Sequence, residues 1–277
     1  MSWNQRHKYA SAGFMDAGVI DLDRRETWPA QVCEEIDKRV ADLIRERLEQ
    51  RAYDLSGDRW HKSSPPKPST DLVTDLINRT MASKRLRVFH ATRLLGFDEI
   101  RKNGLRTLRY AERIERLKQL AAGPLAHLPK TIDEIVTDAN LASNYFAYRE
   151  AMVWATPLRR SLHDGGCDVF FENWGGEAVQ RIAELASPEL AAAIRTVGTP
   201  AVVVVCMPAF GFCKMADLRL APTMIDLALE RDGSIEVAVG SWDVRAEANV
   251  PPEWIEDVLP HDHASLLRVE SGRAGSQ

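Results

Sequence analysis

The sequence predicts an α+β fold, in which helices and strands occupy different parts of the chain. Apolar stripes with a helical period dominate the first half of the 277-residue chain, whereas short β-branched runs dominate the later core. The strongest run, Ala201 to Met207, lies between Pro200 and Pro208 and predicts a central strand. Because helices and strands do not alternate regularly, the pattern disfavours a doubly wound parallel sheet.

The composition is that of a folded globular protein. Hydrophobic residues make up 45% and charged residues 27%, which argues against global disorder. The formal net charge of -4 disfavours a broad nucleic-acid-binding surface. No apolar run is long enough to cross a bilayer, and the polar start lacks the apolar core of a signal peptide. The four cysteines form no C-x-x-C pair, so we expect reduced thiols and a soluble, cytoplasmic protein without membrane contact.

Residues 1–82 predict an N-terminal helical extension that includes a Pro/Ser linker. A first helix begins near Pro29, which suits a first-turn position, and carries an apolar stripe as far as Leu48. The segment Ser63 to Ser69 is rich in proline and serine and predicts a linker. A second helix is predicted from Asp71 to Met81. Its expected inward residues are Leu72, Val73, Leu76 and Ile77.

Residues 83–262 predict the main domain, and residues 263–277 predict a flexible tail. The predicted strands are 87–91, 151–156, 201–207 and 235–239. The predicted helices are 97–102, 110–122, 131–148 and 177–194. Asn103-Gly104 predicts the end of the first of these helices, because glycine tolerates a left-handed backbone. Residues 168–171 suit either a short strand or the lead into the last helix.

The most informative residue is His90, which lies in the predicted strand between Phe89 and Ala91. One ring nitrogen of such a histidine can bind a ligand hydroxyl while the protein holds the other nitrogen. Thr92 lies two residues further along the strand and therefore points to the same face. The strand therefore predicts one polar ligand site. The alternative interpretation is that His90 is a core histidine whose hydrogen bonds are all made within the protein.

Two segments carry a family resemblance. The strand with His90-Ala91-Thr92, the short helix after it and Gly104-Leu105 resemble the first motif of the ADP-ribosyltransferase superfamily. The segment Pro251 to Ile255 is similar to the Pro-Pro-Glu-x-Ile-like end of many members. The resemblance covers about Arg85 to His261, and it implies a split β-sheet that binds NAD as a substrate. It also implies that His90 binds the nicotinamide-side ribose, with Thr92 and Arg93 beside it.

The resemblance also implies a catalytic carboxylate, because an oxocarbenium-like state develops as the bond to nicotinamide breaks. Glu236, in the predicted strand 235–239, is one candidate; the alternative interpretation is that it is a solvated strand residue without a catalytic role. Glu247 lies closer to the closing segment. Glu177 is a second candidate, with a helix-start role as its alternative. It ends the string Asn173-Trp174-Gly175-Gly176-Glu177, whose glycines and helix start suit an anion such as a pyrophosphate.

Several aromatic and polar residues are candidates for the pocket wall. Trp154 and Thr156 fall where the superfamily often has its second core strand, which carries residues beside the nicotinamide. Tyr145 and Tyr148 are candidates for stacking on the nicotinamide, with ordinary packing as the alternative. Trp174 and Gly104 complete the set of cofactor-binding candidates.

The function that the resemblance implies is that of a mono-ADP-ribosyltransferase, a glycosyl-transferring enzyme that modifies a protein or a nucleic acid. Some bacterial members are toxins or defence factors with a neutralising partner protein, which the N-terminal helices could contact. One alternative is an RNA 2′-phosphotransferase, for which Arg93, Arg101 and Arg106 could supply phosphate ligands. Another alternative is a catalytically inactive NAD-binding protein on the same fold. His261-Asp262-His263 is expected to be solvated, so no metal site is predicted.

Overall fold

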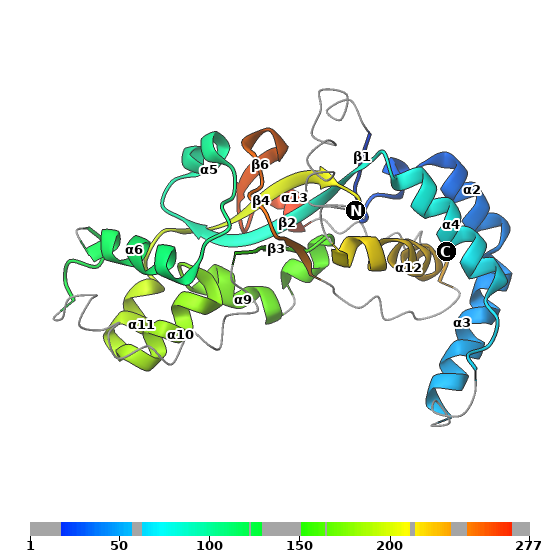
Figure 1. Ribbon diagram of the computed structural model, residues 1–277, viewed down its shortest axis with the longest axis horizontal. Coiled ribbons are helices and arrows are strands. Elements are labelled where there is room, and N and C mark those ends of the chain that lie inside the picture. Colours follow the sequence, from blue (N-terminus) through cyan, green and yellow to red (C-terminus); the bar gives the residue numbers. More distant parts are fainter. Residues whose placement is uncertain are drawn as a thin grey trace, which may run out of the picture. The chain divides into compact units, whose positions relative to one another are not determined.

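The computed structural model describes residues 18–56, 63–121, 123–128, 151–163, 165–210, 214–233 and 243–267. The chain divides into two compact units. Unit 1 comprises residues 1–86, 208–242 and 270–277, and unit 2 comprises residues 87–207 and 243–269. Both helices and a mixed sheet are present, in agreement with the predicted α+β class (Figure 1).

Unit 1 is built mainly from helices. Its principal members are α2 (Ala30–Lys38), α3 (Val40–Leu55), α4 (Pro68–Met81) and α12 (Lys214–Arg231). Helix α4 contacts the other three (Figure 1). Strand β1 (Val19–Ile20) pairs in parallel with Arg85 and Leu86, and the 3-10 turn η3 (Arg25–Thr27) follows it. Helix α12 was not predicted.

The structure corrects three details of the N-terminal prediction. The first predicted helix is two helices, because Arg39 between them has φ -109° and ψ 9°. Pro29 lies one residue before α2, at the N-cap, rather than in its first turn. Leu72 was expected to face inward but is 53% exposed, because α4 buries the narrower stripe of Val73, Ile77 and Met81.

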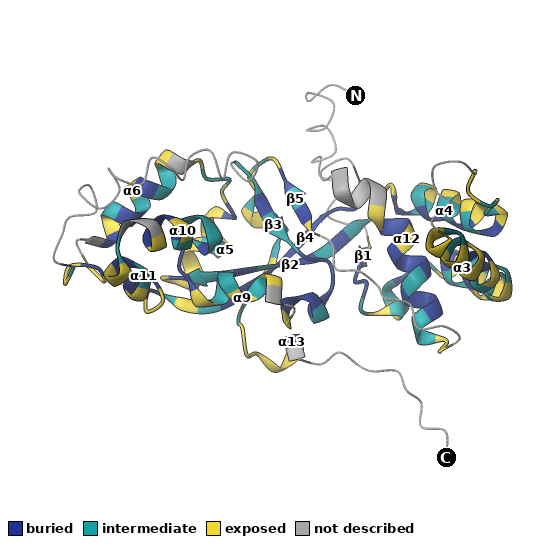
Figure 2. Ribbon diagram, turned by 90° about the horizontal axis from the view of Figure 1, so that it is seen from below, coloured by how far each residue is buried: buried dark blue, intermediate teal, exposed yellow. Residues whose placement is uncertain are grey.

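Unit 2 contains most of the strands. Strand β4 (Thr199–Pro208) lies between β2 (Arg85–Leu94) and β6 (Ile255–Pro260), and it pairs with β6 in antiparallel fashion. Strands β3 (Val153–Ala155) and β5 (Val244–Ala246) form a separate antiparallel pair. Residues 201–209 are all buried, which confirms the predicted central strand (Figure 2).

The remaining described elements of unit 2 are helical. They are α5 (Phe97–Asn103), α6 (Tyr110–Ala121), η5 (Arg159–His163), α9 (Gly165–Glu172), α10 (Gly176–Ala186), α11 (Pro188–Ile194), η6 (Pro252–Trp254) and α13 (Ala264–Leu267). The ambiguous residues 168–171 belong to α9. The predicted helix 177–194 is two helices, because Ser187 caps α11 by accepting from the Leu190 N–H and Pro188 opens it. The predicted helix 131–148 and strand 235–239 lie outside the described residues.

Two apolar clusters hold the helices of unit 2 in place. One joins Phe89 and Ala91 of β2 to Val202 and Val204 of β4. The other joins Leu117 and Leu120 of α6 to residues of α10 and α11 and of the turns before and after them. Its members there include Trp174, Val179, Leu190 and Val197. None of the described helices combines the length and the apolar composition that a bilayer span requires.

Candidate functional site

Unit 2 contains a cavity of about 580 Å³, a size suited to a small organic ligand. Its wall is made by β2, by α5 and the turn after it, by one side of α6, by Met152–Trp154 and by the approach to α10. Residues from widely separated parts of the chain therefore meet around one space.

His90 stands in this wall, with its ring fixed by a hydrogen bond. Its Nδ1 lies 2.6 Å from the carbonyl oxygen of Trp154. The strand pairing places that carbonyl, because Phe89 exchanges two backbone hydrogen bonds, of 2.7 and 2.9 Å, with Thr156. Phe89 enters the apolar core, whereas His90 and its successors, including Thr92, line the cavity. Residues two apart in a strand point to the same face, so His90 and Thr92 present two polar side chains on one side of β2.

The ring of His90 is neutral near pH 7. Burial lowers its pKa, the Trp154 carbonyl opposes this effect, and the positive charge of Arg113 lowers the pKa further. A carbonyl oxygen only accepts, so Nδ1 of the neutral ring carries the proton and donates to Trp154. Nε2 then has a lone pair that can accept a hydrogen bond from a ligand hydroxyl.

The turn after α5 is fixed by Gly104, which lines the same cavity. Its φ is 71°, and a Cβ at this position would lie 2.1 Å from the carbonyl oxygen of Val250. Leu105 and Val250 exchange two backbone hydrogen bonds of 2.9 and 2.8 Å. The two segments that carry the family resemblance, Gly104-Leu105 and the one beginning at Pro251, are therefore neighbours.

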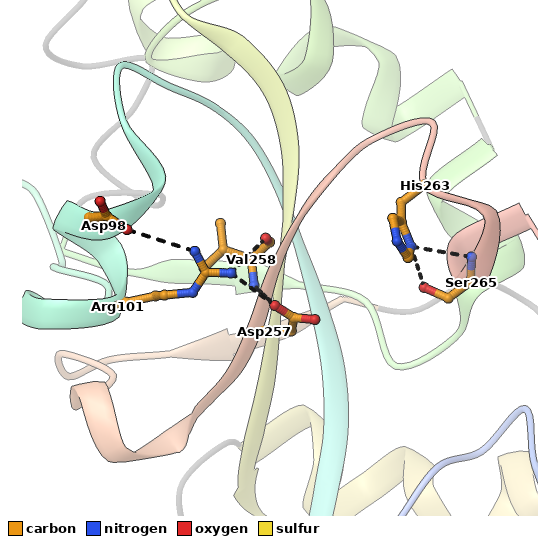
Figure 3. Close-up of polar contacts among 6 residues, drawn as sticks. All are labelled: Asp98, Arg101, Asp257, Val258, His263 and Ser265. Carbon is orange, nitrogen blue, oxygen red and sulfur yellow. Dashed lines mark hydrogen bonds and ion pairs between the residues drawn. The ribbon is translucent and has the colours of Figure 1, made fainter.

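Side chains strengthen this junction. Arg101 of α5 donates to the Asp257 carboxylate at 3.0 Å and to the Val258 carbonyl at 3.2 Å, both in β6 (Figure 3). The Asn249 side-chain oxygen accepts from the N–H and the hydroxyl of Thr107, at 2.9 and 3.1 Å. Helix α5 is thereby held against the closing segment, which keeps the cavity wall in place.

The string Trp174-Gly175-Gly176 forms another part of the wall. Gly175 and Gly176 have φ values of 79° and 66°. An added Cβ would lie 2.3 Å from the Val179 side chain or 2.7 Å from the Phe170 ring, respectively. Both positions therefore require glycine, and the backbone approaches the cavity where α10 begins.

The charged residues of the wall are mostly basic. Among the described lining residues, one is a carboxylate, Glu99, and four are arginines: Arg93, Arg106, Arg113 and Arg116. Arg93 has a structural role, because its three guanidinium nitrogens donate at 2.7 Å to the carbonyls of Phe171, Val197 and Gly198. Arg106 pairs with Glu112 at 3.5 Å, and Arg113 lies 3.5 Å from the Gly175 carbonyl oxygen.

The structure brings most of the predicted site residues together. Those that line the cavity are His90, Thr92, Arg93, Gly104, Trp154 and Trp174. Thr156 and Glu177 do not line it; Thr156 is buried and pairs with Phe89. Tyr145, Tyr148 and Glu236 lie outside the described residues, and Glu247 does not line the cavity.

Sequence reasoning missed Glu99, Arg113, Arg116 and Asn249. The three-residue spacing of Arg113 and Arg116 on a predicted helix was an available signal, because such residues share a face. Nothing in the sequence placed that face at the cavity. Among the described residues, no group of three or more histidine, cysteine, aspartate or glutamate side chains is arranged to hold a metal ion.

Comparison of the chain with known protein families, with curated proteins and with solved structures finds no significant match. The resemblance to ADP-ribosyltransferases therefore depends on the sequence motifs alone.

Proposed function

We propose that the cavity of unit 2 binds NAD and that the chain transfers ADP-ribose from NAD to a macromolecular acceptor. One observation carries the proposal. The neutral His90, fixed through Nδ1 by Trp154, stands in one cavity wall with the Gly104 turn. An imidazole that presents an acceptor nitrogen in a fixed position suits a ribose hydroxyl.

The reaction breaks the bond between the ribose C1′ and the nicotinamide nitrogen. Neutral nicotinamide leaves with the bonding electron pair, and an acceptor nucleophile, from a protein or a nucleic acid, forms a bond to C1′ and loses a proton. The aromatic lining residues Trp154, Phe170 and Trp174 provide apolar surface for the nicotinamide and adenine rings. His90 orients the ribose so that C1′ stays accessible.

Nicotinamide release from labelled NAD, with candidate acceptors present, tests the proposal. His90→Ala is expected to lower the rate about fivefold, since one hydrogen bond contributes about 1 kcal/mol and 1.4 kcal/mol is a factor of ten. His263→Ala is the matched control, because His263 is exposed and bonds to Ser265 (Figure 3). NAD binding without turnover would indicate an inactive NAD-binding protein, and neither binding nor turnover would contradict the proposal.

Glutamine substitution can identify the catalytic carboxylate among three candidates. Glu99 is the one carboxylate among the described lining residues, and Glu177 and Glu236 are the sequence candidates. Replacing the essential carboxylate by glutamine is expected to lower turnover by about 10²–10³-fold, as the loss of transition-state stabilisation does in other enzymes. NAD affinity should change much less. If none of the three glutamine variants lowered turnover by this much, none of the three carboxylates would be the catalytic one.

A second candidate function is transfer of an RNA 2′-phosphate to NAD. The arginines of the cavity favour it, because that chemistry requires several arginines near a phosphate. Arg93 and Arg106 of the predicted set line the cavity, whereas Arg101 binds β6 instead. Consumption of a 2′-phosphorylated RNA with release of ADP-ribose cyclic phosphate would support this function over ADP-ribosyl transfer.

A further inference from the structure

One residue of the cavity wall, Asn249, has a side-chain amide whose two ends differ in their contacts. Its oxygen Oδ1 accepts from the backbone N–H of Thr107 at 2.9 Å and from the Thr107 hydroxyl at 3.1 Å. A backbone N–H only donates, so the end of the amide that faces it is the oxygen, and the opposite end is the nitrogen Nδ2. The two bonds to Thr107 therefore fix the orientation of the amide.

The nitrogen Nδ2 of Asn249 is a donor that the fold leaves unused. It carries two N–H groups, and none of the described residues accepts a hydrogen bond from it. Asn249 is exposed and lines the cavity of unit 2. We propose that Nδ2 of Asn249 donates to an acceptor oxygen of the ligand and thereby positions NAD in the cavity. The identification of the ligand as NAD rests on the proposed function.

The backbone beside Asn249 is held as firmly as its side chain. The next residue, Val250, exchanges two backbone hydrogen bonds with Leu105, and its carbonyl oxygen lies against Gly104. An exposed side chain normally loses rotamer freedom when it binds a ligand, and that loss weakens binding. Asn249 is already ordered by Thr107, so a hydrogen bond from Nδ2 would carry little of this cost.

Asn249 and His90 place opposite demands on a ligand. The neutral His90 ring offers an acceptor at Nε2 and requires a ligand hydroxyl, whereas Asn249 offers donors and requires a ligand oxygen that accepts. A ligand that satisfies both must carry both groups. In NAD the ribose hydroxyls meet the first requirement, and the nicotinamide carbonyl and the diphosphate are the two strong acceptors that meet the second.

Calorimetric titration of the full chain with NAD, in the wild type and in Asn249→Asp, tests the proposal. Aspartate keeps an oxygen for both Thr107 bonds but replaces the donor by a second acceptor. NAD affinity is expected to fall at least about fivefold, the value of one ordinary hydrogen bond. The new negative charge also repels the NAD diphosphate, but salt screens charge. The loss should therefore persist at about 1 M salt, where the Debye length is about 3 Å.

Two further variants separate ligand binding from a purely structural role of Asn249. Thr107→Val removes the hydroxyl but keeps the backbone N–H that orients the amide, so NAD affinity should stay within about twofold of the wild type. Asn249→Ala removes both ends of the amide and should weaken NAD binding as Asn249→Asp does. A loss in Asn249→Ala but not in Asn249→Asp would show that Asn249 only holds the turn, and would overturn the proposal.

Titration with nicotinamide and with ADP-ribose identifies the part of NAD that Asn249 contacts. In Asn249→Asp, weaker binding of nicotinamide would assign the contact to the carboxamide carbonyl, and weaker binding of ADP-ribose would assign it to the diphosphate part; either result supports the proposal. Equal NAD affinities of Asn249→Asp and the wild type at high salt would overturn it and leave the proposed function in place. A wild-type chain that does not bind NAD would contradict both.

Discussion

Two polar side chains, one in each unit, differ in how completely the protein satisfies them. Glu46 of α3, in unit 1, is 3% exposed, and its carboxylate accepts three hydrogen bonds of 2.9 Å from Ser69 and Thr70. His90 of unit 2 has one bond, at Nδ1, and Nε2 has no partner among the described residues. Glu46 therefore caps the first turn of α4, whereas His90 keeps a lone pair beside a cavity. A satisfied polar group stabilises the fold, and a half-satisfied one is available to a ligand.

The largest effect is expected where the wall beside His90 is most crowded. Gly104→Ala would place a Cβ 2.1 Å from the Val250 carbonyl at a φ of 71°. We expect a loss of more than about 3 kcal/mol in the free energy of unfolding, measured in urea. Gly96→Ala is the control, because no atom lies within 4 Å of its added Cβ, and should cost less than about 1 kcal/mol. If Gly104→Ala lowered the unfolding free energy no more than Gly96→Ala, the backbone at Gly104 would accommodate a Cβ without appreciable strain.

The cap in unit 1 is expected to give the next largest effect. Glu46→Ala removes the acceptor of the Ser69 and Thr70 N–H groups and should cost about 1–2 kcal/mol of unfolding free energy. Glu49→Ala on the same helix is the matched control, since Glu49 is exposed, and should stay within about 0.5 kcal/mol. An equal effect of the two changes would show that the Glu46 bonds add little.

His90→Ala should destabilise the protein less than Glu46→Ala. The Trp154 carbonyl that loses its partner lies beside a cavity that water can enter, so the cost should not exceed about 1 kcal/mol. Ligand binding, in contrast, should fall strongly. If His90→Ala were as costly as Glu46→Ala and left NAD binding unchanged, His90 would be a core histidine.

The smallest effect is a difference in pH dependence. Burial lowers the pKa of His90, so its contribution to stability is fully present above the unfolded value of about 6.5 and is lost as the pH falls toward the folded value. Burial tends to raise the pKa of Glu46, but the bonds from Ser69 and Thr70 lower it overall. Its contribution is present above about 4.3 and is lost only below that. Between pH 7 and 5, His90→Ala should therefore flatten the stability profile, whereas Glu46→Ala should leave its slope unchanged.

Local patterns predicted several elements well. The alternation in β2, the glycine at the end of α5, the period of α6 and the β-branched run of β4 depend on neighbouring residues, so a sequence shows them. The exposure of Leu72 depends on how the helices of unit 1 pack, which no local pattern contains. The apolar stripe continues across Arg39, so the pattern did not show the break there. Helix α12 has Pro222 inside it and only a weak amphipathic pattern, so it gave no periodic signal.

The sequence by itself determined that His90 and Thr92 share a face of a strand and that Gly104 ends a helix, because strand alternation and backbone sterics are local. Only the tertiary structure decided what surrounds them. The pairing of Phe89 with Thr156 supplied the carbonyl that holds the His90 ring, and the packing of α6 brought Arg113 and Arg116 to the same cavity. Those contacts join residues far apart in the chain, and long-range packing rather than local pattern sets them.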